Sequence, residues 1–193
     1  MVLTEKQIRK IKRSKKLGRA GYAGQVYLYK NKAWKFFHKP VTSDTDLPVN
    51  YDGLISTVGV GTRFVCFPEI LATLAGSPTD EYIGYKRRAV KKIDNMEKLS
   101  SRDLNINITK LEKDFILMAD LGITPIDVHA SQFIESKDGL YIIDTDNYSK
   151  EEPYDPLVAI GILHDALLNY ITFCSKSKRI DSIILERVQG RRR

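Results

Sequence analysis

The sequence has few cysteines and no long apolar run. Its two cysteines, Cys66 and Cys174, lie far apart in apolar surroundings. This pattern favours buried, inert thiols over a disulfide or a nucleophile, and no Cys/His spacing resembles a zinc site. No apolar stretch approaches the roughly 20 residues of a membrane span, and no apolar signal region follows the charged start of the chain. We therefore expect an intracellular, cytoplasmic protein.

Acidic residues are outnumbered, and the positive charge is concentrated at the two ends of the chain. The formal net charge is +7, and the chain ends in Arg191, Arg192 and Arg193. Such ends suit nucleic acid, an anionic surface or an acidic partner, although a solvated helix face and a frayed tail give the same composition. The N-terminal cluster consists of Lys6, Arg9, Lys10, Lys12, Arg13, Lys15, Lys16 and Arg19.

The predicted elements divide the chain into a β-rich first half and a helical second half, which indicates an α+β fold with a buried core. Thr4 and Gln7 form a capping box that predicts a basic helix over residues 5–16. Between residues 44 and 60 any helix should be short or irregular because Pro48, Gly53 and Gly59 interrupt it. Strands are predicted over residues 26–29, 32–37, 64–67, 82–85 and 140–143, with turns at 31–32 and 75–80.

Apolar residues at helical spacing predict the helices of the second half. The first should begin at an Asn107 cap and end at Gly122. The next two should cover residues 157–173 and 180–188. His164 lies on the apolar face of the middle helix, so we interpret it as a core or interface histidine and not as a catalyst.

The most informative stretch of the sequence covers residues 124–149. It contains a loop with Asp127, His129 and Gln132, then a Lys-Asp-Gly turn and an apolar strand. Asp144 and Asp146 follow that strand directly. Two separated acidic sites, each after an apolar segment, suit a cation-assisted transfer in which one carboxylate orients a nucleophile and the other binds a metal.

A glycine-rich segment precedes the first strands. Gly18, Gly21 and Gly24 recur at intervals of three residues. Such glycines let backbone amides approach a phosphate closely. On the strand that follows, Trp34 and Lys35 face opposite ways, so one is buried and the other can reach a ligand.

These motifs together resemble the protein-kinase-like superfamily, in particular its bacterial and aminoglycoside-phosphotransferase-like branch. The loop of Asp127, His129 and Gln132 is similar to the family's catalytic loop, D-x-H-x-x-N, and Gln132 stands where the family has its metal-binding Asn. Ala-Trp-Lys ending at Lys35 resembles the A-x-K strand of the small lobe. Asp144 follows Asp127 by seventeen residues, which fits the family's pattern for the magnesium-binding aspartate.

The resemblance implies a kinase that uses ATP and Mg²⁺ and phosphorylates a protein Ser/Thr or a small-molecule hydroxyl. Asp127 would orient the acceptor hydroxyl, Lys35 would contact the phosphates, and His129 would orient the loop or touch the transferred phosphate. The implied metal ligands are Gln132, Asp144 and Asp146. The implied nucleotide-binding residues are Gly18, Gly21, Gly24, Val26, Lys35, Lys86 and Arg88.

The resemblance also implies a bilobal fold. Residues 1–85 would form a β-rich N-lobe, residues 86–90 a hinge, and residues 91–193 a reduced helical C-lobe with little or no activation loop. The acid that pairs with Lys35 is left open between Asp52 and Glu69. A pseudokinase or nucleotide-binding interaction module with a basic surface is the alternative function, because Gln132 replaces the family's Asn.

Overall fold

A computed structural model describes residues 1–92 and 101–175, and within these ranges it leaves the side chains of residues 101–105 and 173–175 undescribed. The predicted helix over 180–188, the three terminal arginines and the Cys174 side chain lie outside the described part. The fold is α+β, as predicted, with a six-stranded sheet and four α-helices in the described residues. No helix among them has the length and apolar character to cross a membrane.

The chain divides into two compact units that are built from interleaved segments. Unit 1 comprises Met1–Gly61, Cys66–Val90 and Thr145–Ser149. Unit 2 comprises Thr62–Val65, Lys91–Asp144 and Lys150–Arg193.

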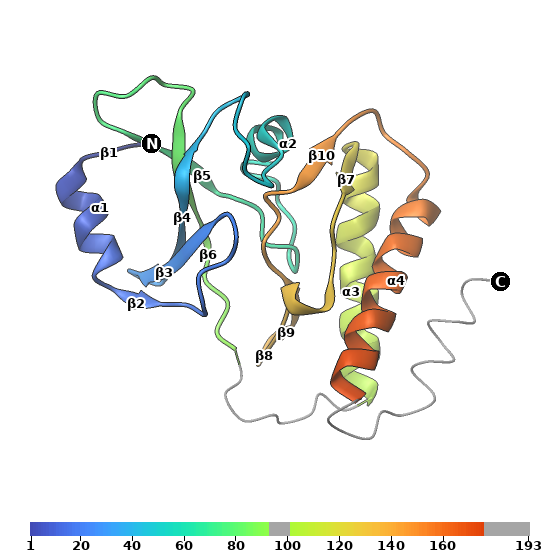
Figure 1. The fold of residues 1–193 in the computed structure, drawn as a ribbon. Helices are drawn as coiled ribbons and strands as arrows, with labels where there is room; N and C mark the ends of the chain where they lie inside the picture. Colours follow the sequence, from blue (N-terminus) through green and yellow to red (C-terminus); the bar gives the residue numbers. More distant parts are fainter. Residues whose placement is uncertain (93–100, 176–193) are drawn as a thin grey trace. The chain divides into compact units, whose positions relative to one another are not determined.

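Unit 1 contains the six-stranded sheet, whose strand order is β1-β5-β6-β4-β3-β2 (Figure 1). Neighbouring strands of this sheet are antiparallel except β1 and β5, which run parallel. Lys30 and Asn31, with φ values of 49° and 58°, form the two-residue turn that joins β3 to β4. Two consecutive residues with positive φ match the twist of the strands in a hairpin with a two-residue turn. The strands are β1 Val2–Leu3, β2 Lys15–Lys16, β3 Gly24–Tyr29, β4 Lys32–Val41, β5 Ile70–Leu74 and β6 Tyr82–Arg88.

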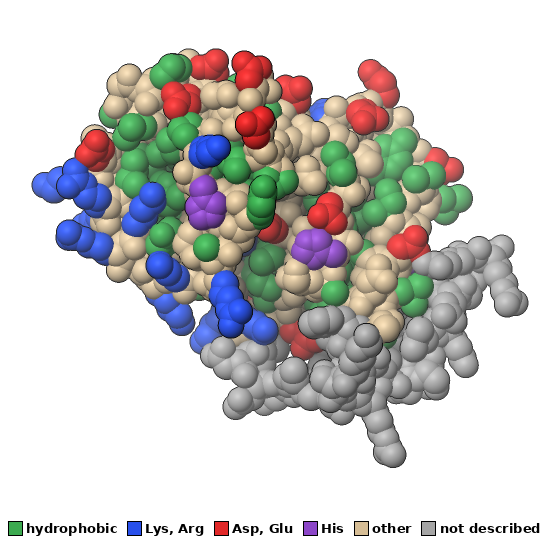
Figure 2. All heavy atoms as spheres, in the orientation of Figure 1, with side chains coloured by type: hydrophobic (Ala, Val, Ile, Leu, Met, Phe, Trp, Pro, Cys, Tyr) green, Lys and Arg blue, Asp and Glu red, His purple; other side chains and the backbone are tan. Residues whose placement is uncertain are grey.

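Helix α1 covers Glu5–Lys12 and begins at the predicted capping box of Thr4 and Gln7. It is shorter than predicted because the chain caps the helix at Arg13 and then enters β2. Ile11 packs with the apolar side chains of one sheet face, including Trp34. The basic side chains of the helix are exposed, and Figure 2 shows Lys and Arg side chains gathered on this part of unit 1.

Helix α2, Tyr51–Ser56, lies on the other face of the sheet (Figure 1). Its short length confirms the expectation for this region, although the cap is Asn50, whose side chain accepts from the Gly53 amide. Leu54 is fully buried and belongs to one core cluster with Phe37 and Tyr85 of the sheet. The two helices therefore bury opposite faces of the same sheet.

The strand predicted over residues 64–67 is absent, and β5 begins at Ile70 instead. Phe64 and Val65 are buried, but their backbone amides donate to the Asp114 carboxylate at 2.5 and 3.0 Å. Only an isolated bridge joins Val65 to Ile142. The prediction was wrong because a short apolar run marks burial and does not reveal whether a neighbouring strand or a carboxylate satisfies its amides.

Unit 2 is built mainly on two long helices, α3 Ser101–Asp120 and α4 Pro156–Ser175, which lie side by side (Figure 1). His164 of α4 is 2% exposed, and its Nε2 lies 2.9 Å from Glu112 Oε1 of α3, which confirms its assignment to the core. Gly122, at φ +69°, follows the end of α3 as predicted. Asn107 does not cap α3, because the helix begins six residues earlier.

The strands of unit 2 are short. The predicted Lys-Asp-Gly turn joins β8 to β9, and the predicted strand over 140–143 is β9. Strand β10 lies where the chain leaves unit 1 and enters unit 2. The bounds are β7 Ile123–Pro125, the 3₁₀ helix η1 Ala130–Gln132, β8 Phe133–Ser136, β9 Gly139–Ile142 and β10 Tyr148–Lys150.

Gly53 allows α2 to approach the segment Thr145–Ser149 within unit 1. A Cβ atom at Gly53 would lie 1.6 Å from the carbonyl oxygen of Tyr148. We expect Gly53→Ala to lower the free energy of unfolding by about 2 kcal/mol or more, because this overlap outweighs the roughly 1 kcal/mol that Ala gains over Gly in a helix. Urea unfolding measures the change. Gly61→Ala is the matched control, since nothing lies within 4 Å of its Cβ position, and equal stability of the two variants would contradict the prediction.

Candidate functional site

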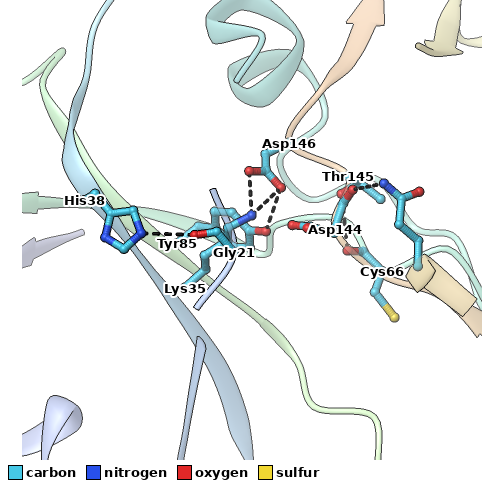
Figure 3. Close-up of polar contacts among 9 residues, drawn as sticks. Gly21, Lys35, His38, Cys66, Tyr85, Asp144, Thr145 and Asp146 are labelled. Atoms are coloured by element: carbon cyan, nitrogen blue, oxygen red, sulfur yellow. Dashed lines mark hydrogen bonds and ion pairs between the residues drawn. The ribbon is translucent and has the colours of Figure 1, made fainter. Parts of the chain in front are cut away.

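Lys35 is buried in unit 1 and forms an ion pair with Asp146. Its Nζ donates to Oδ2 and Oδ1 of Asp146 at 2.7 and 3.0 Å, and the Tyr85 hydroxyl donates to Oδ1 at 3.2 Å (Figure 3). Lys35 is 5% exposed and Asp146 is 4% exposed. Charges removed from water to this extent are usually paired and hydrogen-bonded, because an isolated buried charge is costly. The three side chains therefore form one buried polar cluster in the sheet core.

The sheet register places Lys35 and Tyr85 together. The two residues are direct partners in the β4–β6 ladder, so their side chains leave the same face of the sheet. That face is the one covered by α2, since Tyr85 and Leu54 share a core cluster. Val26 is the partner of Lys35 on β3, so this predicted nucleotide-binding residue also lies on the Lys35 face.

Asp146 is held in place by one backbone contact and two side-chain contacts of the segment Thr145–Ser149. The amide of Asn50 donates to the Asp146 carbonyl oxygen at 2.9 Å. The Thr145 hydroxyl donates to the Cys66 carbonyl oxygen at 3.3 Å (Figure 3). The Tyr148 ring packs edge-on against Phe67, with 5.6 Å between centroids. These contacts fix the carboxylate under Lys35.

Neither of the two acids proposed as the partner of Lys35 contacts it. Asp52 lies exposed in the first turn of α2. Glu69 accepts from Lys32 Nζ, at 2.6 and 2.9 Å. The prediction failed because the true partner is 111 residues away in sequence, where only the fold brings it to Lys35. In the structure the Asp146 carboxylate accepts from Lys35 and Tyr85. Its predicted role as a metal ligand stays a prediction.

Gln132 and Asp144 lie at the ends of neighbouring elements of unit 2. The Gln132 Nε2 donates to the Asp144 carbonyl oxygen at 3.4 Å, and the Ile143 amide donates to the Gln132 carbonyl oxygen at 2.9 Å. Gln132 is buried, and within the described residues its Oε1 has no hydrogen-bond partner. Asp144 has a φ of +68°, a backbone conformation that is costly for a residue other than glycine and is concentrated at functional sites.

Both residues carry side-chain oxygen atoms of the kind that bind a divalent cation. A buried amide oxygen without a donor and a nearby carboxylate-bearing residue are the kinds of ligand that Mg²⁺ takes, usually together with waters and substrate phosphates. The described residues contain no group of three His, Cys, Asp or Glu side chains that could hold a metal without such help. Gln132 would therefore supply its amide oxygen, and Asp144 its carboxylate, to a metal that also needs ligands from a phosphate.

Asp127 and His129 lie in the exposed loop between β7 and η1. The His129 Nδ1 lies 2.8 Å from the Ser131 hydroxyl oxygen, and its Nε2 lies 4.0 Å from Asp127 Oδ2. The Asp127 side chain is 61% exposed. Ser131 therefore orients the imidazole beside a solvent-exposed carboxylate.

The three predicted glycines have different structural roles. Gly18 adopts a φ of +74°, and nothing lies within 4 Å of its Cβ position. Gly21 donates its amide to the Gly24 carbonyl oxygen at 2.9 Å, and its own carbonyl oxygen lies 3.0 Å from His38 Nε2 (Figure 3). A Cβ at Gly24 would lie 2.2 Å from the Phe36 carbonyl oxygen. Gly24 is therefore required by strand packing, while Gly18 and Gly21 shape the loop before it.

Arg87 shares the sheet face of Lys35, whereas the two neighbours predicted from the sequence do not. Arg87 is the ladder partner of Ala33, two residues from Lys35, while Lys86 is the partner of Trp34 and Arg88 the partner of Lys32. Alternation along β6 therefore puts Lys86 and Arg88 on the opposite face. Arg87 is 5% exposed, its Nε has no hydrogen-bond partner, and no carboxylate in the described part of the chain pairs with it.

Tyr85 and Arg87 are the residues of this face that sequence reasoning missed. Alternation from Lys35 through the β4–β6 register identifies both residues, but the register is known only once the strands are paired.

Comparison with known proteins does not assign the chain to a family. No protein-family model matches the chain, and a search of curated proteins finds no significant match.

We expect Arg87→Met to unfold at an equal or higher temperature than the wild-type protein in the absence of ligand. The substitution keeps the packing of a long side chain and removes a buried cation without a carboxylate partner, a change that is often neutral or stabilising by about 1 kcal/mol or more. Thermal unfolding at low and high salt measures the effect. Lys86→Met, whose Nζ lies 3.9 Å from a Glu69 oxygen, is the control. A marked destabilisation of Arg87→Met alone would show that the guanidinium is paired.

Proposed function

We propose that the protein binds ATP with Mg²⁺ and transfers the terminal phosphoryl group to a hydroxyl of a protein or a small molecule. The observation that carries this proposal is the buried Lys35 on the sheet face beside Val26, paired with Asp146, whose carboxylate also accepts from the Tyr85 hydroxyl. Burying an ammonium costs several kcal/mol unless it is paired. A lysine kept in this position, in an A-x-K strand after a glycine-rich segment, suits a group that binds phosphate.

Unit 1 would bind the nucleotide phosphates. Phosphoryl transfer depends mainly on charge neutralisation and alignment, so a fixed ammonium and backbone amides are useful groups. Lys35 supplies the ammonium. The segment containing Gly18 and Gly21 supplies amides in a loop with little side-chain bulk.

Unit 2 would supply the groups that bind the metal and orient the acceptor. Gln132 and Asp144 have the oxygen atoms that suit Mg²⁺. Asp127 would accept the proton of the acceptor hydroxyl, with His129 beside it. Magnesium, when bound, would neutralise charge on the phosphates.

A bilobal kinase-like fold is part of the same proposal. Such a fold would have residues 1–85 as N-lobe, residues 86–90 as hinge and residues 91–193 as C-lobe, although β6 continues through Arg88, so that only residues 89 and 90 of this hinge lie beyond the strand. The antiparallel β3–β4 hairpin with the glycine-rich segment before it and Lys35 within it supports this assignment.

The alternative is a pseudokinase that binds nucleotide without transferring phosphate. Gln132 in place of the family's Asn, and a partner for Lys35 that does not come from α2, favour it. The experiment below separates the two functions.

For the kinase proposal we expect ATP with Mg²⁺ to raise the unfolding temperature, and phosphate transfer to be lost in two isosteric variants. Asp127→Asn should keep the ATP-induced shift but lower transfer by about 100-fold or more, because it removes the proton acceptor. Asp144→Asn should lose the part of the shift that requires Mg²⁺, and Asn tolerates the left-handed backbone at this position. Thermal unfolding and transfer of labelled phosphate are the measurements.

Asp138→Asn, at an exposed position in the β8–β9 turn, is the matched control and should behave as wild type. A shift with ATP but no transfer by wild-type protein would favour the pseudokinase. Transfer undiminished by both substitutions, or no shift at all, would reject the kinase proposal.

A second candidate function is nucleic-acid binding by the exposed face of α1. Lys6, Lys10 and Arg13 recur at spacings of four and three residues, so they lie on one side of the helix, away from the buried Ile11. Figure 2 shows Lys and Arg side chains gathered there. A row of exposed cations suits a phosphate backbone.

For this second function we expect a labelled single-stranded oligonucleotide to bind at low salt and to dissociate steeply as salt increases. Replacing Lys6, Lys10 and Arg13 by Gln should weaken binding and flatten the salt dependence, because fewer counterions are released. Fluorescence anisotropy measures both. Replacing the exposed Lys113 and Lys137 of unit 2 by Gln is the control. No binding at low salt, or equal loss in the control, would reject this function.

A further inference from the structure

Helix α2 contributes no carboxylate to Lys35. Its acid, Asp52, is exposed, and no hydrogen bond or ion pair in the described part of the chain joins it to Lys35. What α2 and its cap provide is a backbone contact, from the Asn50 amide to the Asp146 carbonyl oxygen. The Asp146 carboxylate, in the segment that follows Asp144 in the chain, pairs with Lys35.

We propose that Asp146, with Tyr85, is the positioning residue that holds Lys35 for binding the nucleotide phosphates. This inference rests on the proposed function of Lys35. It assigns Asp146 to the lysine and not to the metal, and it gives Tyr85 a role that the sequence did not indicate.

The geometry suits positioning. Both oxygens of Asp146 accept from the ammonium, and the Tyr85 hydroxyl donates to one of them. A lysine side chain loses up to about 2 kcal/mol of rotamer entropy when it is fixed. Because the folded protein already fixes Lys35, that cost is not met again when a phosphate binds, and preorganisation of this kind raises affinity.

The position of Lys35 is thereby tied to the chain next to the proposed metal-binding residue. Asp146 follows Asp144 by two residues. Thr145, between them, is anchored to the Cys66 carbonyl oxygen. A displacement of this short segment would move the carboxylate away from Lys35, and α2 acts on the ion pair through the backbone contact of its Asn50 cap and not through a charge.

A purely structural ion pair is the competing explanation, and the energetics of buried pairs separate the two. Removing one partner costs about 3–5 kcal/mol because a buried charge is left alone. Replacing both by apolar residues of similar size is often neutral or stabilising. The double variant Lys35→Met/Asp146→Leu should therefore fold, even if a single substitution does not.

The experiment compares the affinities of full-length variants for ATP with Mg²⁺ and for adenosine, which has no phosphate. Isothermal calorimetry gives both dissociation constants, and circular dichroism confirms that each variant is folded. Asp146→Asn and the double variant should bind ATP at least 10-fold more weakly than wild type while their affinity for adenosine stays the same. Tyr85→Phe, which removes only the hydroxyl, should weaken ATP binding by a smaller factor.

Unchanged ATP affinity in Asp146→Asn, or in the double variant, would overturn the positioning role. An equal loss of ATP and adenosine affinity would also overturn it, because general damage to the site weakens both ligands. A wild-type protein that binds no ATP would instead reject the proposed function itself. The two failures are therefore distinguishable.

Discussion

The cost of burying the Lys35 ammonium constrains the structure of unit 1. A cation that is 5% exposed in a sheet core needs a carboxylate at hydrogen-bond distance, and Asp146 provides it. The carboxylate in turn requires the segment Thr145–Ser149 to lie against α2, which is possible only because Gly53 has no side chain. One buried charge thus accounts for three features: the close backbone approach at Gly53, the lack of an acid on the sheet side of α2, and the position of the Tyr85 hydroxyl.

Local features of the fold were predictable from the sequence, because neighbouring residues determine them. The capping box of Thr4 and Gln7 starts α1, and Gly122 follows the end of α3. The apolar run over residues 64–67 was predicted wrongly, since its amides bond to Asp114, a partner far away in sequence. Periodicity reports which residues are buried, but it does not report what satisfies their backbone.

In the candidate site, too, the sequence predicts individual residues but not their partners from distant parts of the chain. Motif spacing selected Lys35, and the structure gives it a buried, paired ammonium. Spacing could not select Asp146 as its partner, nor Tyr85 and Arg87 as residues of the same sheet face, because strand register is a property of the folded sheet. Likewise, the lack of a hydrogen-bond donor for Gln132 Oε1 among the described residues can be recognised only from the folded structure.

The discontinuous path of unit 1 has a consequence for dissecting the protein. Unit 1 takes its last segment, Thr145–Ser149, from beyond most of unit 2. A fragment that stops at residue 90 would contain all six strands of the sheet but would lack the Asp146 carboxylate, which pairs with Lys35 in the folded protein. Gene truncation, domain grafting or circular permutation of this chain should therefore keep the stretch around Asp146 together with the sheet.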